Sequence, residues 1–274
     1  MSDHPAETVP AIPASEYDAV LYDLDGVLTD TASLHAQAWK QMFDEFLRRY
    51  AADHDIPFEP FEIATDYRSY VDGKPRYEGV SAFLESRRIV LPEGSIDDPP
   101  EADTTYGLGN RKNEVVQKLI QEGVDVYETS LRLVRILLDA GVRAAVVSSS
   151  RNARPVLDTV GIADLFEVVV DGVTAAEDDI PGKPEPDMFL AAAERLGVEP
   201  ARTVVVEDAI AGVEAGHGGE FGLVIGVNRE DDHGENAVAL RNHGADIVVD
   251  DLGELLQPAE NPTGSEAGGS AATA

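Results

Sequence analysis

Six short runs rich in valine are the feature that most limits what this chain can fold into. Each run is apolar at consecutive rather than alternate positions and ends near a polar residue; the runs are residues 19–23, 144–148, 167–171, 203–207, 223–227 and 246–250. Such runs are typical of strands that are buried on both faces of a parallel sheet. Helix-like segments lie between them, for example residues 126–140 before Gly141 and 187–196 before Gly197. The alternation predicts an α/β fold with a doubly wound, Rossmann-like parallel sheet.

The stretch between the first two runs has a different character. Residues 34–50, 77–88 and 112–121 have helical patterns, no valine-rich run lies among them, and a loop of Pro, Gly and acids at 91–103 divides the last two. We therefore expect a small helical cap domain to be inserted after the first strand. The predicted divisions are a core of residues 16–31 and 123–256, a cap of residues 32–122, a disordered extension at 1–15 and a disordered tail at 257–274.

The charge of the chain excludes several classes of protein. Its 274 residues include 52 Asp and Glu but only 21 Lys and Arg, for a net charge of −31, and no Cys. A general nucleic-acid binder or a protein of anionic membrane surfaces needs a basic footprint instead. The absence of Cys excludes disulfide scaffolds, thiolate zinc sites and cysteine nucleophiles. With no secretory signal and no run of roughly 20 apolar residues, we expect a cytoplasmic monomer without nucleic-acid or membrane partners.

Polar residues stand where several of the predicted strands end. They are Asp23, Ser148, Asp171 and the pair Glu207 and Asp208. In an open α/β sheet, ligands bind beyond the carboxyl ends of the strands. Carboxylates that meet there would repel one another without a cation, and hard oxygen ligands favour Mg²⁺. The alternative is that each acid is only a helix cap or a loop residue.

The segment Asp-Leu-Asp-Gly at residues 23–26 adds a chemical function to this edge. Two carboxylates two residues apart at a strand end can divide the work, with Asp23 as nucleophile and Asp25 as general acid and base. Gly26 allows the chain to turn away tightly. A calcium loop is excluded, because Val27 and Leu34 stand where such a loop needs Asp or Asn and Glu.

Four motifs in chain order carry a resemblance to a known family. The first is Asp-Leu-Asp-Gly-Val-Leu-Thr-Asp-Thr-Ala-Ser-Leu-His-Ala-Gln-Ala-Trp-Lys at 23–40, which includes Thr31, His35 and Trp39. The others are Ser-Ser-Ser-Arg-Asn at 148–152, Gly-Lys-Pro-Glu-Pro-Asp at 182–187 and Val-Glu-Asp-Ala-Ile-Ala-Gly at 206–212. Together they resemble the haloacid dehalogenase-like phosphotransferase superfamily, and in particular its β-phosphoglucomutase-like branch.

The resemblance implies a role for each residue of the core motifs. Asp23 would attack phosphorus and form an aspartyl phosphate, and Asp25 would be the acid and base. Asp23, Glu207 and Asp208, with the backbone carbonyl of Asp25, would bind Mg²⁺. Ser148 and Lys183 would hold the transferring phosphoryl group. These roles agree with the chemistry, because phosphoryl transfer needs positive charge around the equatorial oxygens.

The resemblance also implies which residues bind the substrate. Gly73, Lys74 and Arg76 would form a cap loop, in which the planar fork of Arg76 suits a second phosphate. The same phosphate would be held from the core by Ser150, Arg151 and Asn152. The sugar would be held from the cap by Lys112 and Asn113. His35 and Trp39 either contact the substrate or pack near the cap hinge, and Arg76 has the alternative of an ordinary surface cation. Asp72, Pro75 and the long loop 91–103 depart from the family pattern, which puts the sugar in doubt more than the chemistry.

Two enzymatic functions share such a site. A mutase needs a closing cap and two phosphate sites, whereas a phosphatase passes the phosphoryl group to water. Arg76 with residues 150–152 favours the mutase, which would convert β-D-glucose 1-phosphate to glucose 6-phosphate through a bisphosphate. A dehalogenase has no use for Mg²⁺ or for Asp25. A non-catalytic binding protein on this fold is a remote alternative, because every expected catalytic position is filled.

The anionic substrate sets up an expectation about charge. A phosphate must be attracted locally, against the field of a chain with a net charge of −31. We therefore expect the cations to gather at the cleft between core and cap, and the acids to cover the outer surface.

Overall fold

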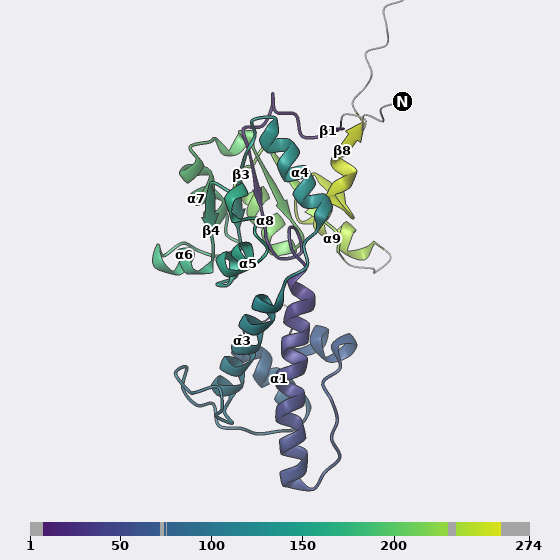
Figure 1. Cartoon of the computed structure of the whole chain (residues 1–274), viewed down its shortest axis with the longest axis vertical. Coiled ribbons are helices and arrows are strands. Elements are labelled where there is room, and N and C mark those ends of the chain that lie inside the picture. Colours follow the sequence, from purple (N-terminus) through teal and green to yellow (C-terminus); the bar gives the residue numbers. More distant parts are fainter. Residues whose placement is uncertain (1–7, 72–73, 75, 230–233, 259–274) are drawn as a thin grey trace, which may run out of the picture.

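The six valine-rich runs form one parallel sheet (Figure 1). In the computed structural model, which describes residues 8–71, 74, 76–229 and 234–258, the strands are β2 (Ala19–Tyr22), β3 (Arg143–Val147), β4 (Val168–Val170), β5 (Thr203–Glu207), β6 (Leu223–Val227) and β7 (Ile247–Val249). All residues of β2 and β5 are buried, as expected for central strands covered on both faces. The predicted doubly wound α/β fold is confirmed.

The order of the strands defines where a ligand can bind. Across the sheet the order is β4-β3-β2-β5-β6-β7, with Val20 of β2 paired to Ala144 of β3 on one side and to Val204 of β5 on the other. The chain therefore moves outward from β2 through β3 and β4, and then returns to the other side of β2. In such sheets the ligand crevice lies beyond the carboxyl ends of the strands at this reversal, which here means the ends of β2 and β5.

Helices cover both faces of the sheet. Alternate residues of β2 and β5, such as Tyr22 and Val206, pack with α4 (Glu128–Asp139) and α5 (Ala153–Thr159). The residues between them, such as Leu21 and Val205, pack with α7 (Asp187–Leu196) and α8 (Ile210–Gly218). The other helices described in this lobe are η2 (Ala163–Leu165), α6 (Gly172–Glu177), η3 (Pro200–Arg202), α9 (Glu235–Asn242) and η4 (Leu252–Leu255).

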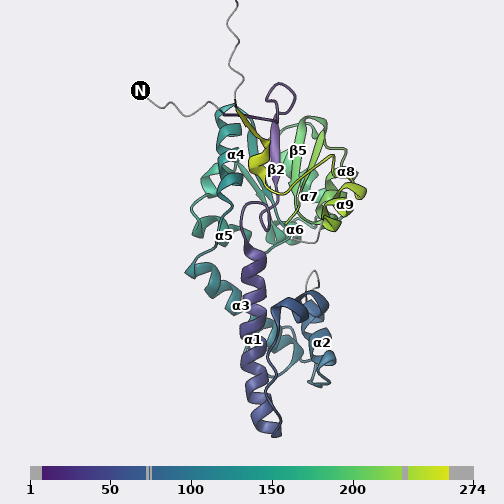
Figure 2. The same ribbon diagram turned by 90° about the vertical axis from the view of Figure 1, so that its right-hand side faces the viewer.

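The helical insert forms a second lobe with a core of its own. It consists of α1 (Thr31–His54), η1 (Ile63–Val71), α2 (Arg76–Ser86) and α3 (Thr105–Glu122). Figure 2 shows α1 running from the sheet along the length of this cap. Aromatic side chains fill the interior, where the rings of Phe43 and Phe83 lie 4.1 Å apart between centroids. The helices α1 and α3 are longer than the ranges 34–50 and 112–121 that the sequence pattern predicted.

Two adjacent chain segments join the lobes. The outgoing segment pairs with the returning one through Asp30 N–H to the Asp125 carbonyl (2.9 Å) and Tyr127 N–H to the Leu28 carbonyl (3.0 Å). Thr29 forms an antiparallel bridge with Val126 between these bonds. The cap therefore connects to the core through a short paired hinge at the carboxyl end of β2.

The predicted disorder of the ends is wrong where the structure describes them. In the 1–15 extension, β1 (Thr8–Pro10) pairs with β8 (Leu256–Pro258), which includes the first two residues of the predicted tail. The side chain of Ile12 is 1% exposed and lies in the core. Pairing between segments so far apart leaves no local pattern in the sequence. Within the described ranges, no helix has the length and apolar character that crossing a bilayer needs.

Candidate active site

The end of β2 places Asp23 against a buried lysine. The backbone N–H of Asp23 donates to the Val206 carbonyl of β5 (2.9 Å), and the residue as a whole is 7% exposed. Lys183 Nζ, from the loop before α7, lies 2.5 Å from Asp23 Oδ1, 2.6 Å from Glu207 Oε1 and 3.0 Å from the Val147 carbonyl oxygen. The reversal of strand order thus brings residues 160 positions apart into one ion pair.

Two glycines make room for the carboxylates at the end of β5. Glu207 is 1% exposed, and its Oε2 accepts the backbone N–H of Ala209 (2.7 Å). A Cβ at Gly212, in the first turn of α8, would lie 1.9 Å from Glu207 Oε1. A Cβ at Gly26 would lie 1.8 Å from Asp208 Oδ2, and Gly26 also has a φ of +86°, which disfavours other residues. A side chain at either position would therefore have to displace a carboxylate of the site.

Asp25 lies between the hinge and the end of β3. Its Oδ1 accepts the hydroxyl hydrogen of Thr31, and its Oδ2 accepts that of Ser148 (3.2 Å). Ser148 Oγ in turn accepts the backbone N–H of Ser150 (3.0 Å). Thr31 was included in the motif that carries the resemblance, but its contact with Asp25 is visible only in the structure.

The predicted grouping of acids is wrong for Asp171. This residue caps α6, where its Oδ1 accepts the backbone N–H and the hydroxyl hydrogen of Thr174, both at 2.8 Å. Arg154 lies 3.3 Å from its other oxygen. The alternative of a helix cap therefore holds at this strand end.

The four remaining carboxylates share one ammonium group. Burial, opposed by Lys183 and reinforced by Glu207, raises the pKa of Asp23 to about 8. Burial also raises the pKa values of Asp25 and of Asp208, and neighbouring carboxylates add to both shifts. For Lys183, burial lowers the pKa, but Asp23 and Glu207 outweigh it and the net shift is upward. The edge therefore carries an excess of negative charge that a cation would relieve.

The oxygen atoms that could ligate a metal at this edge suit a hard divalent cation. Asp23, Asp25, Glu207 and Asp208 offer carboxylate oxygens at this edge, which Mg²⁺ prefers as ligands. Among the described residues, however, no three Asp, Glu, His or Cys side chains form a ready-made metal-binding group. Asp23 and Glu207 are each directed to Lys183 instead.

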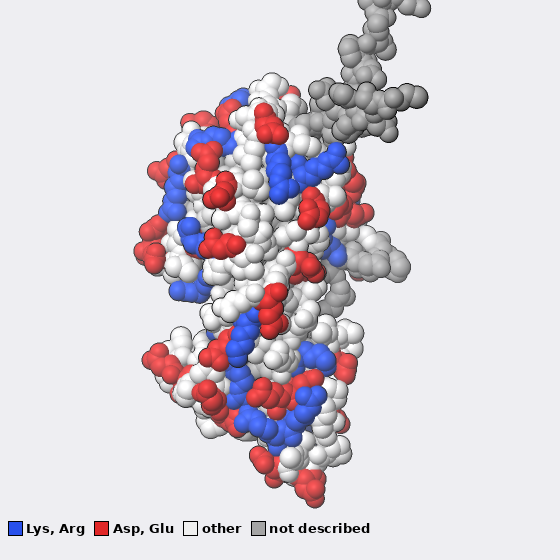
Figure 3. All heavy atoms as spheres, in the orientation of Figure 1, with Lys and Arg blue, Asp and Glu red and all other residues white. Residues whose placement is uncertain are grey.

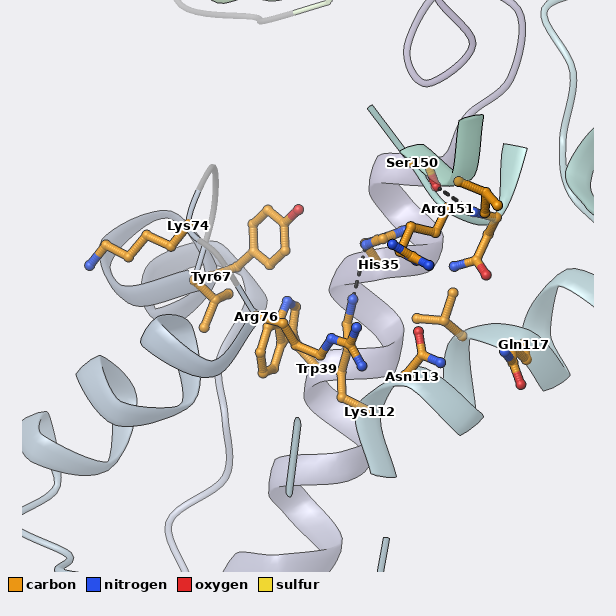
Figure 4. A pocket seen from close by; sticks show the side chains of 14 residues that line it. His35, Trp39, Tyr67, Lys74, Arg76, Lys112, Asn113, Gln117, Ser150 and Arg151 are labelled. Carbon is orange, nitrogen blue, oxygen red and sulfur yellow. Dashed lines mark hydrogen bonds between the residues drawn. The ribbon is translucent and has the colours of Figure 1, made fainter. Parts of the chain in front are cut away.

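A cavity of about 460 Å³ lies between the cap and the core (Figure 4). The structure brings nine of the predicted substrate residues to its walls: His35, Trp39, Lys74, Arg76, Lys112, Asn113, Ser150, Arg151 and Asn152. Gly73, the tenth, lies outside the described residues. The cap residues come from α1, α2, α3 and, for Lys74, the segment between η1 and α2, whereas Ser150 and Arg151 approach from the core side.

The walls of this cavity are positive in a very acidic chain. Lys74, Arg76, Lys112 and Arg151 line it, and its described lining contains no Asp or Glu. The lining also includes Tyr67, Val71, Val116, Gln117 and Val173, which the sequence analysis did not predict. These are common residue types outside the motifs, so no local signal marked them.

Lys112 is the most deeply placed of these cations. It is 6% exposed, its Nζ lies 3.0 Å from His35 Nδ1, and it lies 5.0 Å from the centroid of the Trp39 ring. Burial, with Arg76 nearby, lowers the pKa of Lys112 to about 7, and burial together with Lys112 lowers the pKa of His35 to about 3. The imidazole is therefore neutral at pH 7, and Lys112, in its protonated form, can donate to Nδ1 where the ring hydrogen is on Nε2.

The expectation that cations gather at the cleft is wrong. Figure 3 shows Lys and Arg over both lobes, interspersed with Asp and Glu. Many cations on the outer surface are instead neutralised by acids. The outer arginines form ion pairs such as Arg143–Glu167 (2.6 Å), Arg195–Asp178 (2.5 Å) and Arg202–Asp18 (2.6 Å). The cavity is distinguished by the absence of acids from its described lining.

Comparison with known proteins agrees with this geometry. A sequence model of the haloacid dehalogenase-like hydrolase family matches residues 17–219, which include the paired hinge and every carboxylate at the sheet edge. The chain belongs to the haloacid dehalogenase-like hydrolase family. Among curated members, a β-phosphoglucomutase of Mycobacterium bovis is 53% identical over 239 residues, covering 87% of this chain and 91% of that protein.

Solved members of the haloacid dehalogenase-like family share the fold. β-Phosphoglucomutase from Clostridium difficile is 26% identical, with a TM-score of 0.59 over 87% of this chain and 93% of that chain. A HAD family hydrolase from Deinococcus radiodurans, solved with bound phosphate and sodium, is 29% identical, with a TM-score of 0.64 over 88% of this chain and 93% of that chain. Within the family, this chain is a β-phosphoglucomutase-like enzyme.

Proposed function

We propose that the protein is a Mg²⁺-dependent phosphotransferase that acts on a sugar phosphate through an aspartyl phosphate at Asp23. The specific reaction that we propose is that of β-phosphoglucomutase, from β-D-glucose 1-phosphate to glucose 6-phosphate. The observation that carries this proposal is the acid-free, cationic cavity, whose described lining includes Ser150 from the segment after β3 but not Asp23. It supplies a second phosphate site, which a mutase needs. The 53% identical relative named β-phosphoglucomutase supports it.

The residues at the sheet edge suit the proposed transfer. An oxygen of Asp23 attacks phosphorus, the bond from phosphorus to the sugar oxygen breaks, and Asp25 gives its proton to that oxygen. Burial raises the pKa of Asp25, which favours the protonated carboxyl that this step needs. The Lys183 ammonium and the Ser148 hydroxyl donate to the equatorial oxygens of the phosphoryl group. In the return step Asp25 accepts the proton of the attacking sugar hydroxyl.

Asp23, Glu207, Asp208 and the backbone carbonyl of Asp25 are the proposed holders of Mg²⁺. The ion would neutralise charge on the phosphoryl oxygens and on the crowded carboxylates. The raised pKa values of Asp23 and Asp208 support this proposal, because burial and the neighbouring carboxylates both disfavour their charged forms, and a bound cation would offset both effects.

The cavity suits the phosphate that is not being transferred. Arg76 is held over the ring of Tyr77 (5.1 Å to the centroid) and near the Gly109 carbonyl (3.5 Å). Its fork, the Lys112 ammonium and Arg151 offer donors from both lobes. A ligand that bridges them would favour the closed cap, which excludes water from the aspartyl phosphate. Lys74, Asn113, Ser150, Asn152, His35 and Trp39 complete the proposed substrate site.

Hydrolysis is the second candidate. It is favoured by the relative from Deinococcus radiodurans, which is named a hydrolase and was solved with phosphate. For either reaction we propose a cytoplasmic monomer without nucleic-acid or membrane partners.

One assay separates the two candidates. β-D-Glucose 1-phosphate is supplied with Mg²⁺ and a trace of β-D-glucose 1,6-bisphosphate. Glucose 6-phosphate without inorganic phosphate supports the mutase, whereas stoichiometric phosphate release establishes the hydrolase. Asp23→Asn should abolish turnover in both cases, and an active variant would refute the nucleophile. Asp171→Asn is the matched control, because asparagine also caps helices and this carboxyl lies at a neighbouring strand end.

A further inference from the structure

Arg229, two residues after β6, joins three segments that the proposed reaction must keep together. Its side chain is 19% exposed. It contacts the turn after Asp25, the returning hinge segment and the segment after β7. It belongs to none of the four motifs, and it does not line the substrate cavity.

The contact with the catalytic turn is direct. Arg229 Nε donates to the carbonyl of Gly26 at 2.6 Å. Gly26 follows Asp25, its N–H donates to the Thr29 carbonyl (2.8 Å), and Asp208 packs against its Cα. A charged donor on the Gly26 carbonyl therefore fixes the turn from which Asp25 extends.

The flat face of the Arg229 guanidinium contacts the hinge. The guanidinium carbon of Arg229 lies 3.7 Å from the centroid of the Tyr127 ring. Tyr127 belongs to the returning segment, and its backbone N–H donates to the Leu28 carbonyl. One side chain thus holds both segments that join cap and core.

The third contact ties this pair to the rest of the core. Arg229 Nη1 donates to the Asp250 carbonyl (3.2 Å) and lies 3.9 Å from Asp251 Oδ2. Asp251 accepts the hydroxyl hydrogen of Thr129 (2.8 Å), which follows the hinge at the start of α4. The planar group of arginine can make an edge contact and a face contact at once, and lysine cannot.

We propose that Arg229 is a positioning residue for phosphoryl transfer. It sets the catalytic turn against the hinge, so that Asp25 reaches the same place relative to the phosphoryl group each time the cap closes. A displacement of about 1 Å in such a group can cost about 100-fold in rate. The inference rests on the proposed phosphotransferase function.

Steady-state kinetics of Arg229→Ala and Arg229→Lys test the proposal. We expect kcat of Arg229→Ala to fall about 10- to 100-fold and KM to stay within about three-fold, because the cavity that binds the substrate is untouched. Arg229→Lys should lie between this variant and the wild type. Free guanidinium, at millimolar concentrations, should restore part of kcat in Arg229→Ala by occupying the vacated place between Gly26 and Tyr127.

The matched control is Arg143→Ala. Arg143 also joins separate core segments, since it donates to Glu167 (2.9 Å) and to the Leu196 carbonyl, but it lies at the start of β3, away from the site. It should lower the midpoint of thermal unfolding without changing kcat, and guanidinium should have no effect on it.

Three outcomes would overturn the proposal. The first is a kcat within about two-fold of wild type in both Arg229 variants. The second is a rise in KM of the Arg229 variants at unchanged kcat. The third is an equal loss of kcat in Arg143→Ala together with no guanidinium rescue of Arg229→Ala. If Arg229→Ala does not fold, kcat of Arg229→Lys decides between the same results. A wild-type protein that is inactive on both β-D-glucose 1-phosphate and p-nitrophenyl phosphate would instead refute the proposed function, and this inference with it.

Discussion

Lys183→Met is the change that probes the sheet edge most directly. Methionine keeps much of the length and the apolar stem of the side chain but removes its charge. The lost ammonium lies 2.5 Å from Asp23 and 2.6 Å from Glu207, and the three side chains are 6%, 9% and 2% exposed. The variant therefore leaves two buried carboxylates without their shared partner.

The expected cost follows from this burial. Removing one partner of a buried ion pair destabilises a protein by about 3–5 kcal/mol. We expect that loss at about pH 8 without metal, and a smaller loss at about pH 5.5, where the remaining carboxylates take up protons more readily. In catalysis, losing one charged donor to the phosphoryl oxygens should lower kcat by about 100- to 1000-fold.

Two measurements check the expectation. Urea unfolding at both pH values gives the free energy of unfolding, and the glucose 6-phosphate assay with Mg²⁺ gives kcat. Lys118→Met is the control, because Lys118 is exposed on α3 of the cap and should change neither. A variant as stable as the wild type at the higher pH, or with kcat within about ten-fold of it, would refute the assignment of Lys183 as the counter-charge of this edge.

Two further predictions concern protons. Burial raises the pKa of Asp23 to about 8, so in EDTA the folded protein retains a proton there that the unfolded chain has already released. The free energy of unfolding should therefore fall as pH rises toward 8. Mg²⁺ should flatten this slope in urea titrations, and an identical slope with and without Mg²⁺ would contradict the metal site. Because the pKa of Lys112 is lowered to about 7, kcat/KM for the sugar phosphate should decline as pH rises through that value. Lys112→Arg should remove this step from the pH profile, and a step that persists would assign it to another group.

The sheet and the catalytic edge could be predicted from the sequence because their signals are local. Each buried strand is one uninterrupted apolar run, and the end of the run marks where Asp23, Ser148 and Glu207 stand. The resemblance added residues that no periodicity marks, and the structure brings nine of them to one cavity. Their roles, and the Mg²⁺ site, stay predictions that the experiments above test.

The same local reasoning failed at one strand end and at the N-terminal segment. Asp171 follows a strand as Asp23 does, but a neighbouring Thr174 turns it into a helix cap. Thr8–Pro10 looks like a disordered end until β8 supplies its hydrogen-bond partners.

The sequence by itself determined the valine-rich sheet, the inserted helical cap and the acids at the strand ends, because each depends on neighbours within a few residues. Only the tertiary structure decided which cations are neutralised and which remain to bind a ligand, since that depends on carboxylates brought near by folding. It also placed Arg229 against Gly26 and Tyr127, residues roughly 200 and 100 positions away. Long-range contacts of this kind arise when strands and hinge segments meet at one edge of a sheet.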